Sequence, residues 1–409
     1  MKENIMKMAE HPCSGCGACV AVCPKKAIRI FLDSTGFFVA KVEDNLCIRC
    51  GLCVQVCNRF VESRKMVSLY NAKLYALQSS NEKTVRKCSS GGVAHELAVM
   101  AIRKGYKVVG AVYNLKTNQV EHKIVNELKD ISSLDGSKYL QSNPSEAFRE
   151  AVLDAKNNSE SRFYVFGTPC QIAGMDRVLK KYHIRNQFLL TEIFCHGVPS
   201  YKVWEENCKK LKKKLGTSTF DSVLFRYKKN DWHTYCLRVV ANGKKYYGAR
   251  ETEMFWQVFF ENILLSDACY KCKARKEYSS ADLRIGDYWG ARFQSHTDGV
   301  SAVFACTSQG KEVVEGLIST NRFYVLKESD ATDMLAAQNM EGYSQQKLHD
   351  ETMEILRESG NIRTAIHYYR SRMTGKQKLK RILLRISAVI PDGLRAKLRK
   401  ANSSRLLKK

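Results

Sequence analysis

The pattern of apolar and polar residues predicts a short β-hairpin near the N-terminus of this 409-residue chain. Residues 27–32 and 37–42 are strand-like apolar runs, and the polar residues 33–36 between them are typical of a turn. At this length the chain is too long for one small core, and roughly two to three domains are expected. A larger folded body must therefore follow the hairpin.

The middle of the chain repeats a pattern of strand, loop and helix. The pattern predicts strands at 69–78, 107–113, 163–166 and 188–194, and helices at 93–103, 144–156 and 171–181. This alternation is typical of an α/β body in which the ends of the strands carry the functional site. No G-x-G-x-x-G motif follows any of these strands, so a conventional dinucleotide-binding fold is not supported.

The C-terminal segment is predicted to be a basic helix. Residues 376–409 contain twelve Lys and Arg against one acidic residue, Asp392. Apolar residues recur there at helical spacing, namely Leu379, Ile382, Leu383, Ile386 and Val389. Such a segment is either a solvated helix or an amphipathic helix that lies on an anionic membrane surface or an acidic partner.

The net charge of +26 first suggests a nucleic-acid-binding protein. The C-terminal segment alone supplies about +11 of that charge, so the excess is concentrated at one end and we expect no nucleic-acid partner. No apolar run is long enough to span a bilayer, and residues 1–12 lack the features of a secretory signal. The sixteen cysteines need a reducing compartment to remain thiols. We therefore expect a cytoplasmic protein, peripheral at the inner membrane face if its C-terminal helix binds lipid.

Two cysteine runs with identical spacing flank the predicted hairpin. Their members are Cys13, Cys16, Cys19 and Cys23 in the first run, and Cys47, Cys50, Cys53 and Cys57 in the second. The C-x2-C-x2-C-x3-C spacing is that of bacterial-type ferredoxins with two [4Fe–4S] clusters, in which the fourth cysteine of each run binds the other cluster. Cys57 is therefore assigned to the first cluster and Cys23 to the second. The alternatives are a pair of four-cysteine zinc sites or a disulfide framework.

Several further candidates lie near the ends of predicted strands and helices. Ser89, Ser90, Gly91 and Gly92 precede a predicted helix, where backbone N–H groups bind phosphate or a simple helix cap forms. The other candidates are Cys170 and Cys195, each just beyond a strand, and the C-x2-C pair Cys269 and Cys272. These four thiols are enough for a third cluster or a structural zinc, but sequence spacing alone does not decide that they meet. His196 is either a proton donor or a structural histidine, and the remaining cysteines (Cys88, Cys208, Cys236, Cys306) show no ligand spacing.

Taken together, these motifs resemble the coenzyme F-420 hydrogenase/dehydrogenase beta subunit family. The resemblance runs from the cysteine runs to about residue 330. Its marks are Ser89–Gly92 (SSGG), Ser137–Gln141 (SKYLQ), Gly167–Gln171 (GTPCQ), Phe194–Gly197 (FCHG), Cys269–Cys272 (CYKC) and Gly286–Gly290 (GDYWG). The resemblance implies an oxidoreductase that passes electrons between iron–sulfur clusters and a two-electron carrier through FAD.

The family resemblance also implies roles for individual residues. It favours a third [4Fe–4S] cluster on Cys170, Cys195, Cys269 and Cys272, and a flavin seated on the turns at 89–92 and 167–171. The cofactor-binding candidates are Ser89, Ser90, Gly91, Gly92, Lys138, Gly167, Thr168, Gln171 and Asp287, where a surface salt bridge is the other explanation for Lys138 and Asp287. Similar bacterial proteins occur beside polysaccharide-assembly enzymes, which suggests one possible setting. The partner is a redox protein or a small-molecule electron carrier.

The sequence thus predicts an α+β ferredoxin-like N-terminal domain, a mixed α/β flavin-binding body and a helical basic C-terminal tail. The expected boundaries are 1–66 for the first domain, 67–150 and 151–335 for two α/β domains, and 336–409 for the tail. Two other functions remain open. One is an electron-transfer subunit without a substrate of its own, and the other is a zinc-containing protein that binds nucleic acid.

Overall fold

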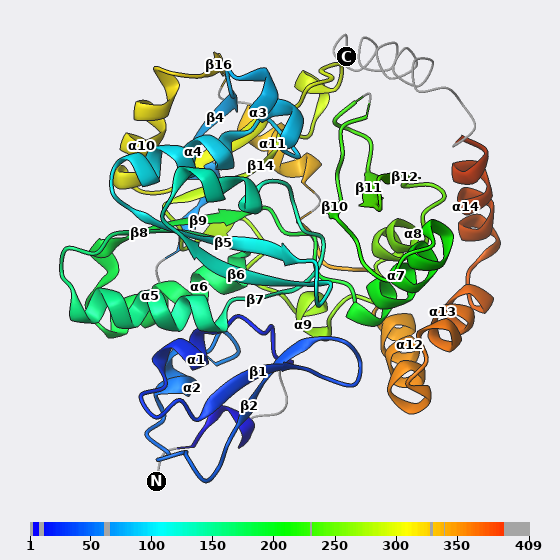
Figure 1. Ribbon diagram of the computed structural model, residues 1–409, viewed down its shortest axis with the longest axis horizontal. Coiled ribbons are helices and arrows are strands. Elements are labelled where there is room, and N and C mark those ends of the chain that lie inside the picture. The colour runs from blue at the N-terminus through cyan, green and yellow to red at the C-terminus, as the bar shows by residue number, and fades with distance from the viewer. Residues whose placement is uncertain are drawn as a thin grey trace.

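The computed structural model describes residues 3–7, 12–60, 66–229, 231–327, 330–338 and 340–387. A nine-stranded sheet lies at the centre of the molecule (Figure 1). Its strands in spatial order are β16 (Arg322–Tyr324), β4 (Lys73–Gln78), β15 (Ser301–Ala305), β14 (Leu283–Asp287), β9 (Phe188–Ile193), β8 (Phe163–Gly167), β5 (Lys107–Asn114), β6 (Gln119–Val125) and β7 (Ser142–Asn143). The sheet takes strands from both sides of residue 150, so the segments 67–150 and 151–335 share one sheet.

Strands β14, β9, β8 and β5 are parallel to one another, which brings their carboxyl ends to one edge of the sheet. Successive side chains of these strands face opposite sides. Val165 and Leu190 face helices α5 (Ser145–Asn157) and α6 (Pro169–Lys181). Their chain neighbours Tyr164 and Leu189 face α4 (Val93–Arg103) and α10 (Ser308–Ile318) on the other side. The predicted mixed α/β body is thereby confirmed.

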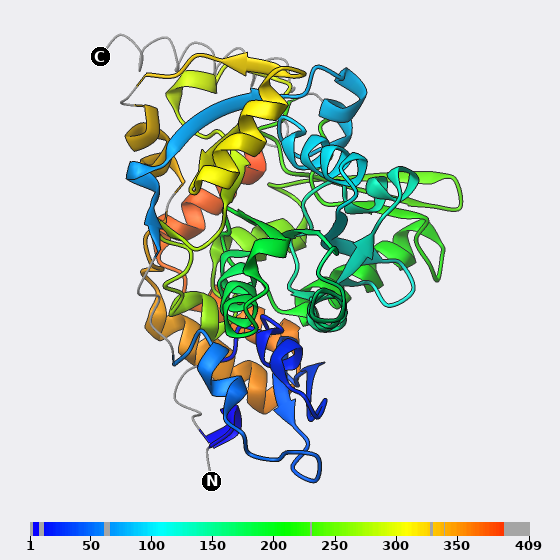
Figure 2. The same ribbon diagram turned by 90° about the vertical axis from the view of Figure 1, so that its left-hand side faces the viewer.

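The N-terminal segment (residues 12–60) packs beneath α5 and α6, and Figures 1 and 2 show it at one end of the molecule. Its hairpin consists of β1 (Ile28–Leu32) and β2 (Phe38–Val42), which pair antiparallel as the sequence predicts. Two short helices, α1 (Ala18–Val22) and α2 (Leu52–Val56), follow the second cysteine of each run and contain the third. Apolar residues of α1 share one core with α5 and α6, so the segment is joined to the body by a common hydrophobic core.

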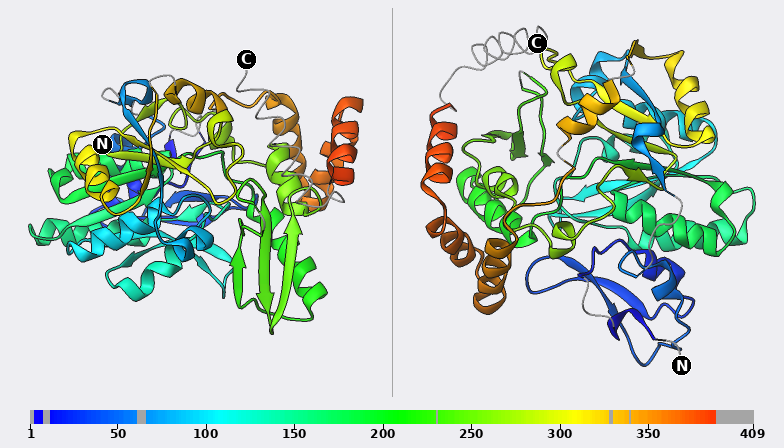
Figure 3. Two further views of the ribbon diagram at one scale, coloured as in Figure 1. Left: turned by 90° about the horizontal axis from the view of Figure 1, so that it is seen from above. Right: turned by 180° about the vertical axis from the view of Figure 1, so that it is seen from behind.

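A third region lies beside the sheet and protrudes from the body as a three-stranded ribbon (Figure 3). It comprises β10 (Ser222–Leu224), β11 (Cys236–Ala241), β12 (Lys244–Ala249), α7 (Tyr201–Leu215), α8 (Met254–Glu261), α12 (Gln346–Ser359) and α13 (Ile362–Ser371). Met353 of α12 and Tyr369 of α13 belong to the same core as Trp204 of α7. Two helices of the predicted tail are therefore part of this core, whereas α14 (Gly375–Ser387) is largely exposed.

Smaller elements complete the described chain. They are α3 (Glu82–Lys87), α9 (Asp267–Tyr270), α11 (Asp330–Ala337), the strand pair β3 (Val67–Ser68) and β13 (Tyr278–Ser279), and the 3-10 helices η1 (Ile5–Lys7), η2 (Leu69–Asn71), η3 (Leu128–Leu134), η4 (Arg185–Gln187) and η5 (Ala291–Phe293). None of the helices in these described ranges is long and apolar enough to cross a membrane. The predicted tail beyond residue 387, including Val389, lies outside the described residues.

Two predicted boundaries were wrong. The strand predicted at 69–78 begins only at Lys73, because residues 69–71 form η2. The helix predicted from Gln171 begins at Pro169. Proline is favoured at a first helical position, where its missing N–H leaves no hydrogen bond unmade.

Candidate redox site

The two cysteine runs adopt the same local backbone. Gly17 precedes α1 and Gly51 precedes α2, both with a φ of 77°, a conformation that costs little only for glycine. The fourth cysteine of each run follows its helix in an extended conformation, as Cys23 and Cys57 both show. The repeated spacing therefore produces two copies of one local structure.

The fourth cysteine of each run lies beside the other run. Burial is the main cause that raises the pKa of Cys16 to about 11, and the charge of the Cys57 thiol raises it further. Burial also raises the pKa of Cys53, with contributions from Cys50 and Cys23. One cavity is lined by Cys23 together with the cysteines of the second run, Cys47, Cys50 and Cys53. This is the arrangement that crossed ligation of two clusters needs.

The spacing of the sulfur atoms bears on the zinc alternative. In the described part of the chain, two groups of Cys, His, Asp or Glu residues have ligand atoms that all lie within 4.8 Å of one another. Neither group contains a cysteine of the two runs. A tetrahedral zinc with Zn–S bonds of about 2.3 Å would draw its sulfurs to about 3.8 Å from each other. The wider spacing suits a cluster that presents its irons at separate corners.

The structure also brings together the four cysteines from the body. Cys170 lies in the first turn of α6 and Cys195 follows β9, and the parallel pairing of β8 with β9 places them at the same edge of the sheet. Burial raises the pKa of Cys269, and the adjacent Cys195 and Cys272 thiols raise it further. Desolvation likewise raises the pKa of Cys170, and the Cys272 and Cys195 thiols raise it further. The four thiols thus share one site, although the chain separates them by as many as 102 positions between Cys170 and Cys272.

This third thiol group adjoins the first cysteine run. The Cys16 thiol is among the charges that raise the pKa of Cys170, after burial and Cys272. Gly174 of α6 allows this approach, because a Cβ there would lie 2.9 Å from the Ala18 Cβ and 3.2 Å from the Cys16 Sγ. Asn58, which stands where the first run has Pro24, donates from Nδ2 to the Cys170 carbonyl at 2.6 Å. The three thiol groups therefore form a continuous series from the N-terminal segment into the sheet.

A buried ion pair holds the loop that follows Cys272. Arg284 of β14 is fully buried and pairs with Glu192 of β9 at 2.5 Å. Its Nη2 donates to the carbonyls of Ala274 and Tyr278 at 3.1 and 2.8 Å. Because an isolated buried charge is very costly, the pair fixes this loop against the sheet.

His196 is held in a structural role by its contacts. Its ring shares a 2.5 Å hydrogen bond with the Asn262 Oδ1 and packs 5.1 Å from the Phe259 ring. Burial lowers the pKa of His196, so the neutral ring is favoured. Its carbonyl accepts a hydrogen bond from Tyr343.

The candidate turn at Ser89–Gly92 is closely packed. Ser89 accepts a hydrogen bond from the Ser137 N–H at 2.8 Å, and the Gly91 N–H donates to the Ser301 Oγ at 3.0 Å. A Cβ on Gly91 would lie 2.5 Å from the Leu77 carbonyl oxygen, so only glycine fits there. The Gly91 N–H is consequently not available to a phosphate.

The second candidate turn is a helix cap. The Thr168 N–H donates to the Gln171 Oε1 at 2.9 Å in a capping box, whose Thr-x-x-Gln spacing is visible in the sequence. Gln171 also donates to the Ser142 Oγ at 2.9 Å, and Thr168 lies 3.2 Å from the Cys170 sulfur. Gly167 packs against the Gln171 side chain. These residues position Cys170 at the start of α6.

Lys138 and Asp287 are both engaged within the protein. Lys138 donates to the carbonyls of Leu134 and Asp135 at 2.8 and 3.0 Å, and burial lowers its pKa to about 8. Asp287 forms an ion pair with Arg226, whose side chain is 1% exposed. The salt bridge that is the other explanation for Asp287 is therefore present, but it lies largely inside the protein and not at the surface.

A cationic cavity lies beside the first turn. It is lined by residues of three segments, including Arg86, Lys87, Asp135, Lys138, Arg226 and Tyr227. Ser137 also lines it and contacts Ser89, so the cavity borders the turn at 89–92. Arg86 and Lys87 are exposed, which leaves their charges accessible to an anion.

Two features had no signal in the sequence pattern. Arg226 was not distinguished from other basic residues, although Asp287 depends on it. Cys88, which shows no ligand spacing, lies with His95 and Asp135 in a group of potential ligand atoms. Only the tertiary structure places these residues together.

Comparisons with known proteins agree with this arrangement. Residues 12–61 match a 4Fe-4S dicluster domain. Residues 160–331 match the C terminus of the coenzyme F420 hydrogenase/dehydrogenase beta subunit. No curated protein matches the chain.

One solved structure with a similar fold is the xenon-derivatised F420-reducing [NiFe] hydrogenase complex from Methanosarcina barkeri. One of its chains has 15% sequence identity and a TM-score of 0.45, over 72% of this chain and 96% of that one. This likeness is too distant to support a functional assignment. The dicluster match shows an iron–sulfur protein. Residues 160–331 are therefore similar to the C terminus of coenzyme F420 hydrogenase/dehydrogenase beta subunits, and residues 12–61 are similar to a 4Fe–4S dicluster domain.

Proposed function

We propose that this protein is an iron–sulfur flavoprotein oxidoreductase that passes electrons between three [4Fe–4S] clusters and a two-electron organic carrier. The ligands of the first two clusters would be the crossed sets, Cys13, Cys16, Cys19 and Cys57, and Cys47, Cys50, Cys53 and Cys23. The third cluster would be held by Cys170, Cys195, Cys269 and Cys272.

The observation that carries the proposal is that the three cysteine sets lie beside one another in series. Cys53 is among the charges that raise the pKa of the buried Cys19, which relates the second set to the first. Cys16 and Cys170 relate the first set to the third. Clusters held by neighbouring ligand sets are close enough to exchange electrons, so the series would conduct between the N-terminal segment and the body.

The body has a cavity suited to the anionic part of FAD. Arg86 and Lys87 line it and would hold the flavin pyrophosphate electrostatically. The turn at 89–92 borders the cavity through Ser137, and the Asp287–Arg226 pair would fix the wall that contains Arg226. Bound FAD would supply the exchange between single electrons and a hydride, which clusters alone cannot perform.

Metal and flavin analysis of anaerobically purified protein tests the proposal. We expect about twelve irons, since three cubanes hold four each, and one noncovalent FAD. Cys272→Ser should lose about four irons and keep the signal of the N-terminal clusters. Cys208→Ser is the control, because Cys208 is a buried thiol of α7 that lies outside these sets. A Cys272→Ser protein with its full iron content would contradict the third cluster.

A separate measurement addresses the carrier. Reduced protein should transfer electrons to a free hydride carrier such as the deazaflavin coenzyme. If flavin and clusters are present but no carrier is turned over, the chain is an electron-transfer subunit that depends on a partner protein.

We further propose that α14 places the protein on an anionic membrane surface. Leu379, Ile382, Leu383 and Ile386 form a stripe at helical spacing, and each is more than 50% exposed. Basic residues flank them, including Lys378 and Arg385. An exposed apolar stripe between basic side chains is typical of helices that bind anionic lipid.

A further inference from the structure

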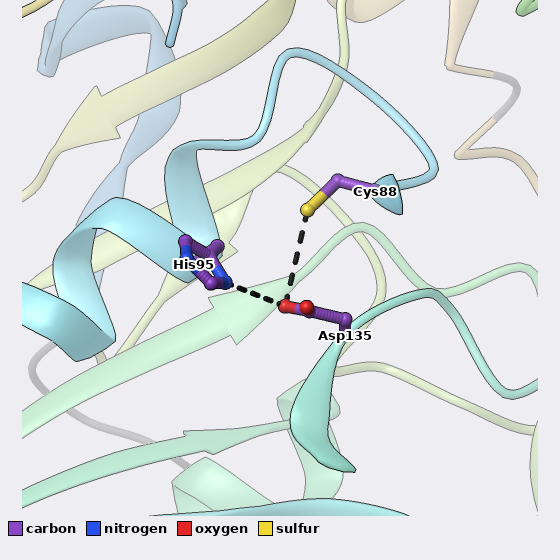
Figure 4. A group of neighbouring side chains, drawn as sticks. All are labelled: Cys88, His95 and Asp135. Carbon is purple, nitrogen blue, oxygen red and sulfur yellow. Dashed lines mark hydrogen bonds and ion pairs between the residues drawn. The ribbon is translucent and has the colours of Figure 1, made fainter. Parts of the chain in front are cut away.

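Three side chains that the proposed redox function does not use converge beside α4. Cys88 follows α3, His95 lies in the first turn of α4, and Asp135 follows η3. One ligand atom from each lies within 4.8 Å of the other two, as Figure 4 shows. The His95 Nδ1 is 2.8 Å from the Asp135 Oδ1, and the Cys88 Sγ is 4.0 Å from the same oxygen. Three separate segments thus direct sulfur, nitrogen and oxygen to one point.

This group is largely buried, but one of its polar atoms lacks a hydrogen-bond partner. Cys88 is 8% exposed, and the side chains of Asp135 and His95 are 9% and 18% exposed. The second carboxylate oxygen of Asp135, Oδ2, is buried and has no hydrogen-bond partner. A buried carboxylate oxygen without a partner carries a desolvation cost, which a ligand at this point would remove.

The nearby positive charges are directed elsewhere. Lys138 donates to the carbonyls of Ser133, Leu134 and Asp135, and Lys228 donates to those of Val85, Ser90 and Asp298. Their amino groups are therefore occupied by backbone oxygens. Cys88 and Asp135 together provide two negative charges when ionised, which balance those of a divalent cation.

We propose that Cys88, His95 and Asp135 bind a divalent transition metal ion, with Zn²⁺ as the expected occupant. Zinc accepts thiolate, imidazole and carboxylate ligands together and is usually four-coordinate, so a water would complete the site. Its binding would release the thiol proton of Cys88, since the thiolate is the metal ligand. A harder cation such as Mg²⁺ would not favour the sulfur or the imidazole.

The metal would join three segments around the turn at 89–92. Cys88 immediately precedes this turn, and Asp135 lies two residues before Ser137, whose N–H bonds Ser89. The site would therefore fix the loop that lines the cationic cavity and the turn that borders it. This structural consequence does not depend on whether the cavity holds a flavin.

Zinc content and zinc X-ray absorption of the anaerobic full-length protein test the site. We expect one zinc per chain after Zn²⁺ addition and dialysis, with one sulfur neighbour and the remainder nitrogen and oxygen. Asp135→Asn keeps the size of the side chain and should weaken zinc binding more than about a hundredfold, as should His95→Gln. Iron content should not change, which separates this site from the cysteine clusters.

Cys208→Ser is the matched control, since it removes a buried thiol outside the group and should retain the zinc. Asp135→Asn provides the test if a Cys88 variant fails to fold. Wild-type protein that takes up no zinc, equal zinc binding by Asp135→Asn, or a zinc spectrum with sulfur neighbours alone would each overturn the proposal. If the wild-type protein binds zinc but contains no flavin, only the proposed function is contradicted.

Discussion

At the scale of single residues, Gly174 illustrates a constraint set by packing. An alanine Cβ there would lie 2.9 Å from the Ala18 Cβ, whereas a Cβ on Gly316 of α10 meets nothing within 4 Å. Glycine-to-alanine changes inside helices ordinarily stabilise by about 0.5–1 kcal/mol. We expect Gly316→Ala to do so and Gly174→Ala to destabilise by about 1–3 kcal/mol through overpacking. Denaturant midpoints of the two variants would check this, and equal midpoints would contradict it.

The burial of His122 leads us to expect that the stability of the protein depends on pH. Its side chain on β6 is 5% exposed, and burial lowers its pKa to about 4. The unfolded chain takes up a proton near pH 6.5 and the folded protein does not, so stability should fall as the pH drops from about 6.5 to 4. The full effect is about 3 kcal/mol.

Anaerobic unfolding curves between pH 5 and 8 would measure this pH dependence. His122→Gln retains a donor for the Phe166 carbonyl, which the His122 Nε2 contacts at 3.1 Å, and does not titrate. Its stability should therefore vary less with pH than that of the wild type. Parallel curves for the two proteins would assign the pH dependence to other groups.

At the scale of elements, α14 differs from the other helices of the C-terminal region. Arg381 attaches it to α8 through a hydrogen bond to Gln257 at 2.9 Å, while its apolar stripe remains exposed. The double change Ile382→Ser with Leu383→Ser should reduce sedimentation with anionic vesicles at low salt by at least about tenfold, because burial of each side chain contributes about 1.5–3 kcal/mol.

Two comparisons control the vesicle experiment. Leu128→Ser alters a leucine on η3 that is 48% exposed and should leave binding unchanged. Uncharged vesicles should bind the wild type poorly, since the basic residues contribute through anionic lipid. If the wild type does not sediment with anionic vesicles, α14 is a solvated helix.

At the scale of the whole molecule, the N-terminal segment and the sheet form one hydrophobic core with a polar contact at its edge. Gln141 is 4% exposed, accepts from the Phe38 N–H at 2.7 Å, and donates to the carbonyls of Phe38 and Ser14 at 3.0 and 3.1 Å. Gln141→Leu would leave these buried groups unpaired, at a cost of roughly 2–4 kcal/mol. We expect the denaturant midpoints for iron release and for loss of helical circular dichroism to fall together.

Gln141→Glu retains the acceptor for Phe38, but it replaces the donor with a buried carboxylate that faces the carbonyl oxygens of Phe38 and Ser14. Its midpoint should therefore also fall below that of the wild type. An unchanged midpoint for iron release in Gln141→Leu would mean that the N-terminal segment is stable without its contact to the body.

The sequence by itself determined the features that depend on short spacings. The two cysteine runs, the hairpin and the alternation of strands with helices follow from local geometry and residue periodicity. The capping box formed by Thr168 and Gln171 is equally local. Such patterns are readable because the interacting residues are near neighbours in the chain.

Only the tertiary structure decided which distant residues meet. Cys170 and Cys195 share a site because the parallel strands β8 and β9 end at one edge of the sheet, and Asp287 pairs with Arg226 across 61 positions. The group formed by Cys88, His95 and Asp135 depends in the same way on the packing of three segments. Contacts of this kind depend on topology and on the space that residues such as Gly174 leave open. Neither can be inferred from the local periodicity of the sequence.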